Sequence, residues 1–122
     1  MASSLHFLTA GIAFFLVGCS QNQTAPATTA QLLQQPNVVV LDVRTPAEFA
    51  NGHLRNARNL DYNGSGFSTQ VADLDTAKTY VLYCGSGVRS GKAVTLMQQQ
   101  GFRKVINAGG FKTLQESGLK TE

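Results

Sequence analysis

The sequence has few residues of the kinds that bind metals in proteins. Its 122 residues include two cysteines and two histidines. It contains no Cys-x-x-Cys pair and no Cys/His cluster with the spacing of a zinc site. His6 lies near the start of the chain, and His53 stands alone. The sequence therefore predicts no metal site, and we expect Cys19 and Cys84 to have separate roles in place of a shared disulfide.

Charged residues are also sparse, at 14% of the chain, and ten Lys and Arg against seven Asp and Glu give a formal net charge of +3. The basic residues form no dense block, which argues against a nucleic-acid-binding surface because such surfaces concentrate their charge. A weak positive bias favours small anionic substrates. The length suits one domain, and 43% hydrophobic residues are enough for a core without metal or disulfide support.

The N-terminal apolar run is too short for a membrane-spanning helix. Residues 5–17 are mostly apolar and uncharged, whereas a span needs about 20 residues. The run fits the apolar core of a secretory signal, although the segment before it has no Lys or Arg. It ends Leu16-Val17-Gly18-Cys19, which resembles the bacterial lipobox, where cleavage precedes a cysteine that then receives lipid.

These features predict a signal peptide at residues 1–18 and lipid attachment at Cys19. The polar, uncharged segment that follows predicts a flexible tether over residues 19–29, and residues 30–122 then form the folded domain. We expect an exported domain, in the periplasm or at the cell surface, that lipid chains hold on a bacterial membrane. The alternative is an ordinary cleaved signal in which Cys19 is incidental.

Within residues 30–122, short apolar runs alternate with helical patterns. We predict strands at 38–41, 80–83 and 105–106, and helices at 30–35, 46–51, 68–72, 90–100 and 111–119. Continuous β-branched runs are typical of strands buried on both faces. The order predicts an α/β fold, a parallel sheet with helices on both faces. Ligands bind beyond the carboxyl ends of such strands, where Cys84 lies.

The segment from Cys84 to Ser90 reads CGSGVRS and joins a strand to a helix. Its two glycines permit a tight curl, and a curl that leads into a helix points several backbone N–H groups inward. Such a cradle stabilises an anion, so the cysteine at its centre is expected to ionise readily. Arg89 adds a positive charge. A buried cysteine with a purely structural role is the alternative.

Three blocks of the sequence resemble the rhodanese family of sulfurtransferases. The first block comprises LDVRTPAEF (residues 41–49), GHL (52–54) and ARNL (57–60), the second is CGSGVRS (84–90), and the third is VIN (105–107) with GGF (109–111). They occur in the family's order from about residue 30 to the end. Arg55 and Asn56 stand where the family often has Pro-Gly, and Asp61 stands where a proline is common.

The resemblance implies a rhodanese domain in which Cys84 carries sulfur as a persulfide. Cys84 would take sulfur from a donor such as thiosulfate and pass it to cyanide or a thiol, without metal or organic cofactor. The N–H groups of the loop would hold the sulfur, and Arg89 the sulfonate end of the donor. The anion-binding residues expected on this basis are Gly85, Ser86, Gly87, Val88, Arg89 and Ser90.

Three acidic or basic residues, Asp42, Arg44 and Glu48, follow the first strand, and we expect them to shape the surroundings of the loop. The spacing of four residues predicts an ion pair between Arg44 and Glu48. In the family the position of His53 belongs to the fold signature, which implies a structural role.

Two alternatives to sulfur transfer remain at this point. One is phosphatase or arsenate reductase chemistry, although related phosphatases have five residues between cysteine and arginine where this chain has four. The other is a non-catalytic sulfur-binding or interaction module. The sequence leaves the oligomeric state open.

Overall fold

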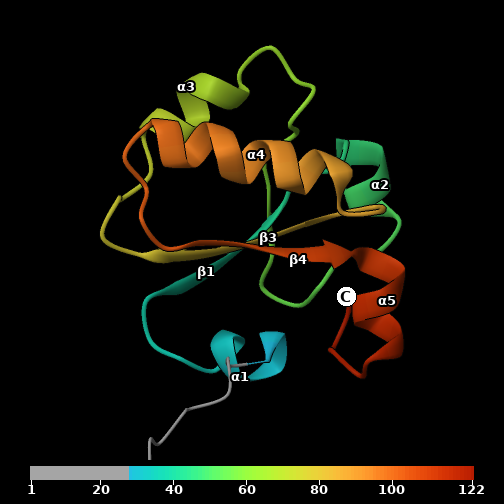
Figure 1. Cartoon of the computed structure of the whole chain (residues 1–122). Coiled ribbons are helices and arrows are strands. Elements are labelled where there is room, and N and C mark those ends of the chain that lie inside the picture. Colours follow the sequence, from blue (N-terminus) through green and yellow to red (C-terminus); the bar gives the residue numbers. More distant parts are fainter. Residues whose placement is uncertain (1–27) are drawn as a thin grey trace, which may run out of the picture.

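The computed structural model describes residues 28–122, and its centre is a four-stranded sheet (Figure 1). The strands are β1 (Val38–Asp42), β2 (Arg58–Asn59), β3 (Thr79–Cys84) and β4 (Val105–Gly110). All neighbouring pairs are parallel, in the order β2-β1-β3-β4. The chain therefore leaves β1 toward one edge to form β2 and returns to the other side of β1 to form β3.

Helices cover both faces of this sheet, which confirms the predicted α/β class. Figure 1 shows α3 (Phe67–Ala72) and α4 (Val88–Gln99) on one face, and α1 (Thr29–Leu33) and α5 (Phe111–Glu116) on the other. The short helix α2 (Pro46–Ala50) follows β1. None of the helices in residues 28–122 has the length and apolarity to cross a membrane. The predicted signal peptide and the Cys19 lipid site lie outside the described residues.

The first two helices begin at capping boxes that the sequence encodes locally. Thr28 caps α1 with Gln31, so the helix begins at Thr29, inside the segment predicted as tether. It ends at Leu33, two residues before the predicted end, because the residue before a proline disfavours helical angles. In α2 the cap is Thr45, which exchanges hydrogen bonds with Glu48.

Alternate residues of β3 contribute to two hydrophobic clusters. Tyr80 and Leu82 pack in the cluster under α3 and α4, which includes Met97, and the Cys84 side chain belongs to the same cluster. Tyr83 points to the other face and packs with Leu114 of α5. Because successive side chains of a strand alternate between faces, the cysteine at the end of β3 lies on the side where α4 begins.

The structure also shows features that the sequence patterns did not predict. The two-residue strand β2 is too short to produce a period of alternation. Helix α4 begins at Val88, two residues early, and α5 ends at Glu116, three residues early. Asn56 has a φ of 67°, a left-handed conformation that asparagine tolerates better than most residues.

Candidate active site

The loop between β3 and α4 folds back over the side chain of Cys84. Gly87 makes this possible with a φ of 94°, and it is the N-cap of α4. Its N–H donates a hydrogen bond to Cys84 Sγ at 3.0 Å. A Cβ atom at Gly87 would lie 3.2 Å from Cα of Gly109 in β4, so both the angle and the space require glycine. The predicted curl around Cys84 is therefore present.

The Cys84 side chain is buried, with 0% relative exposure, among hydrogen-bond donors. The hydroxyl of Ser90, itself 0% exposed, donates to Sγ at 3.3 Å. Burial raises the pKa of the thiol. Hydrogen bonds from the Ser90 hydroxyl and N–H, and from the N–H groups of Ser86 and Gly87, outweigh burial, and the pKa lies below its usual value. The loop therefore favours a thiolate at Cys84.

Asn107 of β4 joins the loop to the sheet, a contact that the sequence analysis missed. Its Oδ1 accepts hydrogen bonds from the Ser90 hydroxyl at 2.7 Å and from the Gly109 N–H at 3.0 Å. Its Nδ2 donates to the Gly87 carbonyl at 3.0 Å. Leu82 pairs with Asn107 and Tyr83 with Gly109, so the ladder skips Ala108 at a bulge. Asn107 was part of the VIN block, but its side-chain role has no signature in a single sequence.

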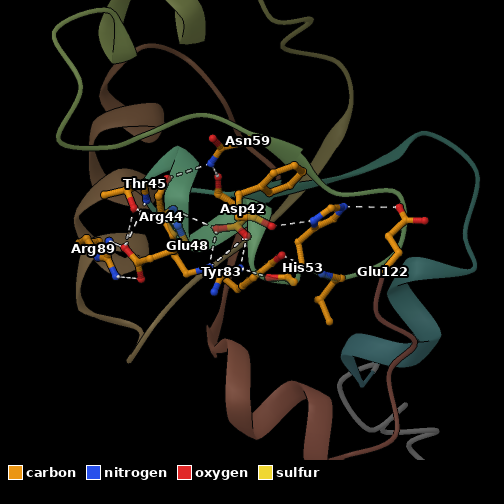
Figure 2. A network of polar contacts seen from close by, with 12 residues as sticks. Asp42, Arg44, Thr45, Glu48, His53, Asn59, Tyr83, Arg89 and Glu122 are labelled. Carbon is orange, nitrogen blue, oxygen red and sulfur yellow. Dashed lines mark hydrogen bonds and ion pairs between the residues drawn. The ribbon is translucent and has the colours of Figure 1, made fainter.

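Arg89 does not stand free beside the loop, because Glu48 of α2 binds it. The guanidinium donates to both carboxylate oxygens, with NH1 to Oε1 at 2.7 Å and NH2 to Oε2 at 3.1 Å (Figure 2). The prediction that Glu48 pairs with Arg44 was wrong. The side-chain hydrogen bond from Arg89 lowers the pKa of Glu48 to about 2, against a smaller opposing effect of burial. This carboxyl group is therefore ionised at any physiological pH.

Arg44 pairs instead with Asp42 at the end of β1. Its Nε donates to both oxygens of Asp42, at 2.9 and 3.1 Å, and NH2 donates at 2.6 Å. NH2 also donates to the Gly52 carbonyl at 2.7 Å. The guanidinium carbon lies 4.3 Å from the ring centroid of Phe111 and 5.6 Å from that of Tyr83. This buried pair connects β1 to the loop after α2 and to the start of α5.

His53 is engaged away from the cysteine loop. Its ring stacks on Phe49 with centroids 3.6 Å apart, and Nδ1 is 2.9 Å from the Phe49 carbonyl oxygen. Nε2 lies 3.6 Å from Oε1 of Glu122. Figure 2 shows His53 and Glu122 on the opposite side of the Asp42–Arg44 pair from Arg89. These contacts agree with the structural role that the sequence implied for His53.

Comparison with known proteins identifies the family. The model of the rhodanese-like domain matches residues 25–117. The chain belongs to the rhodanese-like domain family. It is 37% identical over 98 residues to an uncharacterized protein of Synechocystis, a match that covers 80% of this chain and 54% of that relative. The chain thus spans only about half the length of that relative.

Two further matches extend over most of the length of the protein that the chain is compared with. The chain is 36% identical over 94 residues to the thiosulfate sulfurtransferase GlpE of Pseudomonas fluorescens, which covers 76% of this chain and 84% of the relative. A crystal structure of a rhodanese-related protein from Thermoplasma volcanium superposes with a TM-score of 0.68 at 30% identity. That match covers 79% of this chain and 95% of the other. The predicted fold is therefore shown.

The residues predicted to bind an anion have different surroundings in the structure. The N–H groups of Ser86, Gly87 and Ser90 face the Cys84 sulfur. The side chain of Val88 is turned to solvent, with 61% relative exposure. Gly85 lies beneath the Glu48–Arg89 pair, and a Cβ there would be 3.1 Å from NH2 of Arg89.

Proposed function

We propose that this protein is a sulfurtransferase that carries sulfane sulfur as a persulfide on Cys84. The observation that supports this most directly is the lowered pKa of a buried thiol inside a ring of N–H and O–H donors. A thiolate is the nucleophilic form of cysteine. The same donors suit the terminal sulfur of a persulfide, which also carries negative charge. Sulfurtransferases among the matched relatives agree with this proposal.

With thiosulfate as donor, the Cys84 thiolate attacks the outer sulfur. A bond forms between Sγ and that sulfur, the donor's S–S bond breaks, and sulfite leaves with the electron pair. The acceptor then attacks the outer sulfur of the persulfide. Cyanide yields thiocyanate, and the electron pair of the broken S–S bond returns to Cys84 as thiolate. The N–H groups of Ser86 and Gly87 stabilise negative charge at the sulfur in both steps.

The direct experiment follows sulfur on the purified protein. Incubation with thiosulfate is expected to add one sulfur atom to the peptide that contains Cys84, and cyanide is expected to remove it as thiocyanate. Cys84→Ser should abolish both signals and keep the fold, because the exchange is nearly isosteric. A phosphate ester serves as the control substrate and should not turn over. Full thiocyanate production by Cys84→Ser would refute the proposal, and so would a folded wild-type protein that takes sulfur from no small donor.

We also propose, from the sequence alone, that the mature protein begins at a lipid-modified Cys19. Mass spectrometry of the mature N-terminus tests this, with Cys19→Ser as the matched variant. We expect a lipid mass on Cys19 and release of the variant from membranes or accumulation of its precursor. An N-terminus elsewhere, without lipid, would contradict the proposal. A lipid-blocked Cys19 should also gain no sulfur from thiosulfate.

A further inference from the structure

The choice of sulfur donor depends on what surrounds Arg89, and there the structure shows an unexpected arrangement. Glu48 holds the guanidinium at two points, 2.7 and 3.1 Å. The carboxylate is itself fixed, because Oε1 accepts from the Thr45 N–H at 3.3 Å and from the Thr45 hydroxyl at 3.1 Å. Glu48 also donates its own N–H to that hydroxyl at 3.2 Å. Arg89 is therefore bound to an anchored anion of the protein, in the fork geometry that a donor's sulfonate would need.

This ion pair lies directly on the backbone beside the nucleophile. A Cβ at Gly85 would be 3.1 Å from NH2 of Arg89 and 3.8 Å from Oε2 of Glu48. The hydrogen bond to Glu48 is the main cause of a raised pKa of the Arg89 guanidinium, and an interaction with the Cys84 sulfur adds to it. Glu48 therefore places a fixed negative charge on the same guanidinium that interacts with the Cys84 sulfur.

The two ion pairs beside the loop each sum to zero charge. Asp42 neutralises Arg44, and Glu48 neutralises Arg89. The thiolate of Cys84 adds one negative charge that no further side chain in these pairs balances. Thiosulfate brings two negative charges, and it can pair with Arg89 only by displacing Glu48. A donor with less charge next to its outer sulfur does not need that displacement.

The side chain at the rim of the loop is apolar. Val88 has 61% relative exposure and, among residues 28–122, is the only large hydrophobic side chain that is exposed. It opens α4, one residue before Arg89. An exposed valine at this position can make apolar contacts with the carbon atoms of a thiol carrier. It has no hydrogen-bond donor for a sulfonate.

We propose that Glu48 is a specificity-determining residue that directs this site to persulfides of thiols, R–S–SH, and disfavours sulfonate-bearing donors such as thiosulfate. The proposal rests on the sulfurtransferase function proposed above. The Cys84 thiolate attacks the outer sulfur, the S–S bond of the donor breaks, and R–S⁻ leaves with the electron pair. The proton of the donor moves with the transferred sulfur and is then lost to solvent, which gives the anionic persulfide Cys84–S–S⁻. Only the outer sulfur enters the ring of N–H groups, so the step requires no free Arg89.

The test compares two donors on two proteins. The probes are thiosulfate and freshly prepared cysteine persulfide. In cysteine persulfide the positive charge of the ammonium group and the negative charge of the carboxylate cancel. The variant is Glu48→Gln, which keeps a capping side chain of the same shape and removes the charge. We expect wild type to prefer the persulfide by at least about tenfold in kcat/KM. Glu48→Gln should raise the thiosulfate-to-persulfide ratio about tenfold, mainly through a lower KM for thiosulfate, because Arg89 gains a charged hydrogen bond to the donor.

Glu116→Gln is the matched control, because Glu116 lies on α5 in an exposed pair with Lys112. It should leave the ratio at the wild-type value. An unchanged ratio in Glu48→Gln, or a wild-type preference for thiosulfate, would overturn this inference while both donors still load Cys84. Failure of both donors to load Cys84 would instead contradict the proposed function. Where Glu48→Gln folds poorly, a wild-type preference for thiosulfate still overturns the inference.

Discussion

The Ser90 hydroxyl is the side-chain donor closest to the proposed nucleophile, and its removal tests how the loop stabilises the thiolate. Ser90→Ala takes away the hydrogen bond of 3.3 Å to Cys84 Sγ and leaves the backbone N–H groups in place. Because Ser90 is fully buried, a water molecule has no obvious room to replace the hydroxyl. Asn107 keeps a partner, since the Gly109 N–H still donates to its Oδ1.

The magnitude follows from the charge of the acceptor. A hydrogen bond to a charged group contributes about 1.5–3 kcal/mol, which corresponds to roughly tenfold or more in the ratio of thiolate to thiol. The hydroxyl has one proton and shares it with Asn107 at 2.7 Å, which favours the lower end of that range. We therefore expect the pKa of Cys84 in Ser90→Ala to be higher and its thiolate fraction below that pKa to be about tenfold smaller.

The assay is alkylation of Cys84 by iodoacetamide across a pH series, resolved by peptide so that Cys19 does not contribute. The midpoint of the rate profile should lie at a higher pH in Ser90→Ala than in wild type. Ser86→Ala is the control, because Ser86 acts on the sulfur through its N–H, which the substitution retains. An identical midpoint in wild type and Ser90→Ala would show that the backbone donors alone set the pKa. An equal shift in Ser86→Ala would show a general disturbance of the loop.

Three further predictions follow from contacts of the site. A Cβ at Gly110 would lie 2.6 Å from the Gly85 carbonyl oxygen, so Gly110→Ala should lower kcat at least about tenfold by moving the loop. Gly66→Ala should not, because a Cβ there would make only an ordinary contact, 4.0 Å from Cδ of Gln70. Asn107→Ala loses its hydrogen bonds to the loop and should lower the free energy of unfolding in urea by about 1–3 kcal/mol. The folded-state pKa of Glu48, about 2, lies below its usual 4.5, so its contribution to stability is present above pH 4.5 and lost as pH falls through 2. The stability difference between wild type and Glu48→Gln should therefore disappear by about pH 2, and a difference that persists there would mean that the ion pair is not its source.

The sequence predicted the parts of the site that local signals encode. The apolar run before Cys84 predicted a buried strand, and the change to helical spacing after it placed the cysteine at a strand–helix junction. Gly87 was correctly assigned to a tight curl, because only a residue without a side chain adopts its angle beside β4. The first two predicted helices, at 30–35 and 46–51, begin within one residue of α1 and α2 in the structure. Each of these structural features is determined by a sequence pattern that spans only a few consecutive residues.

The ion pairs were not predictable in the same way. The predicted Arg44–Glu48 pair assumed helical spacing, but α2 begins at Pro46, and Arg44 precedes its cap. Arg44 is therefore not on the helix that carries Glu48, and it turns back to Asp42, two residues away. The actual partner of Glu48 is Arg89, 41 residues along the chain. That contact depends on how β1 and β3 lie side by side, which no local pattern contains.

The topology of the sheet explains why these groups meet where they do. Because β2 and β3 lie on opposite sides of β1, the carboxyl ends of β1 and β3 meet at the point where the strand order reverses. In the register of this pair, Asp42 stands opposite Tyr83, the residue before Cys84. Because successive side chains of β3 alternate between faces, Tyr83 and Cys84 lie on opposite faces of the sheet. Tyr83 points to one face, where its hydroxyl accepts the Leu54 N–H and its ring lies near Arg44. Cys84 points to the other face, toward the N–H groups at the start of α4, so the buried ion-pair network and the proposed thiolate lie on opposite faces at the end of the same strand.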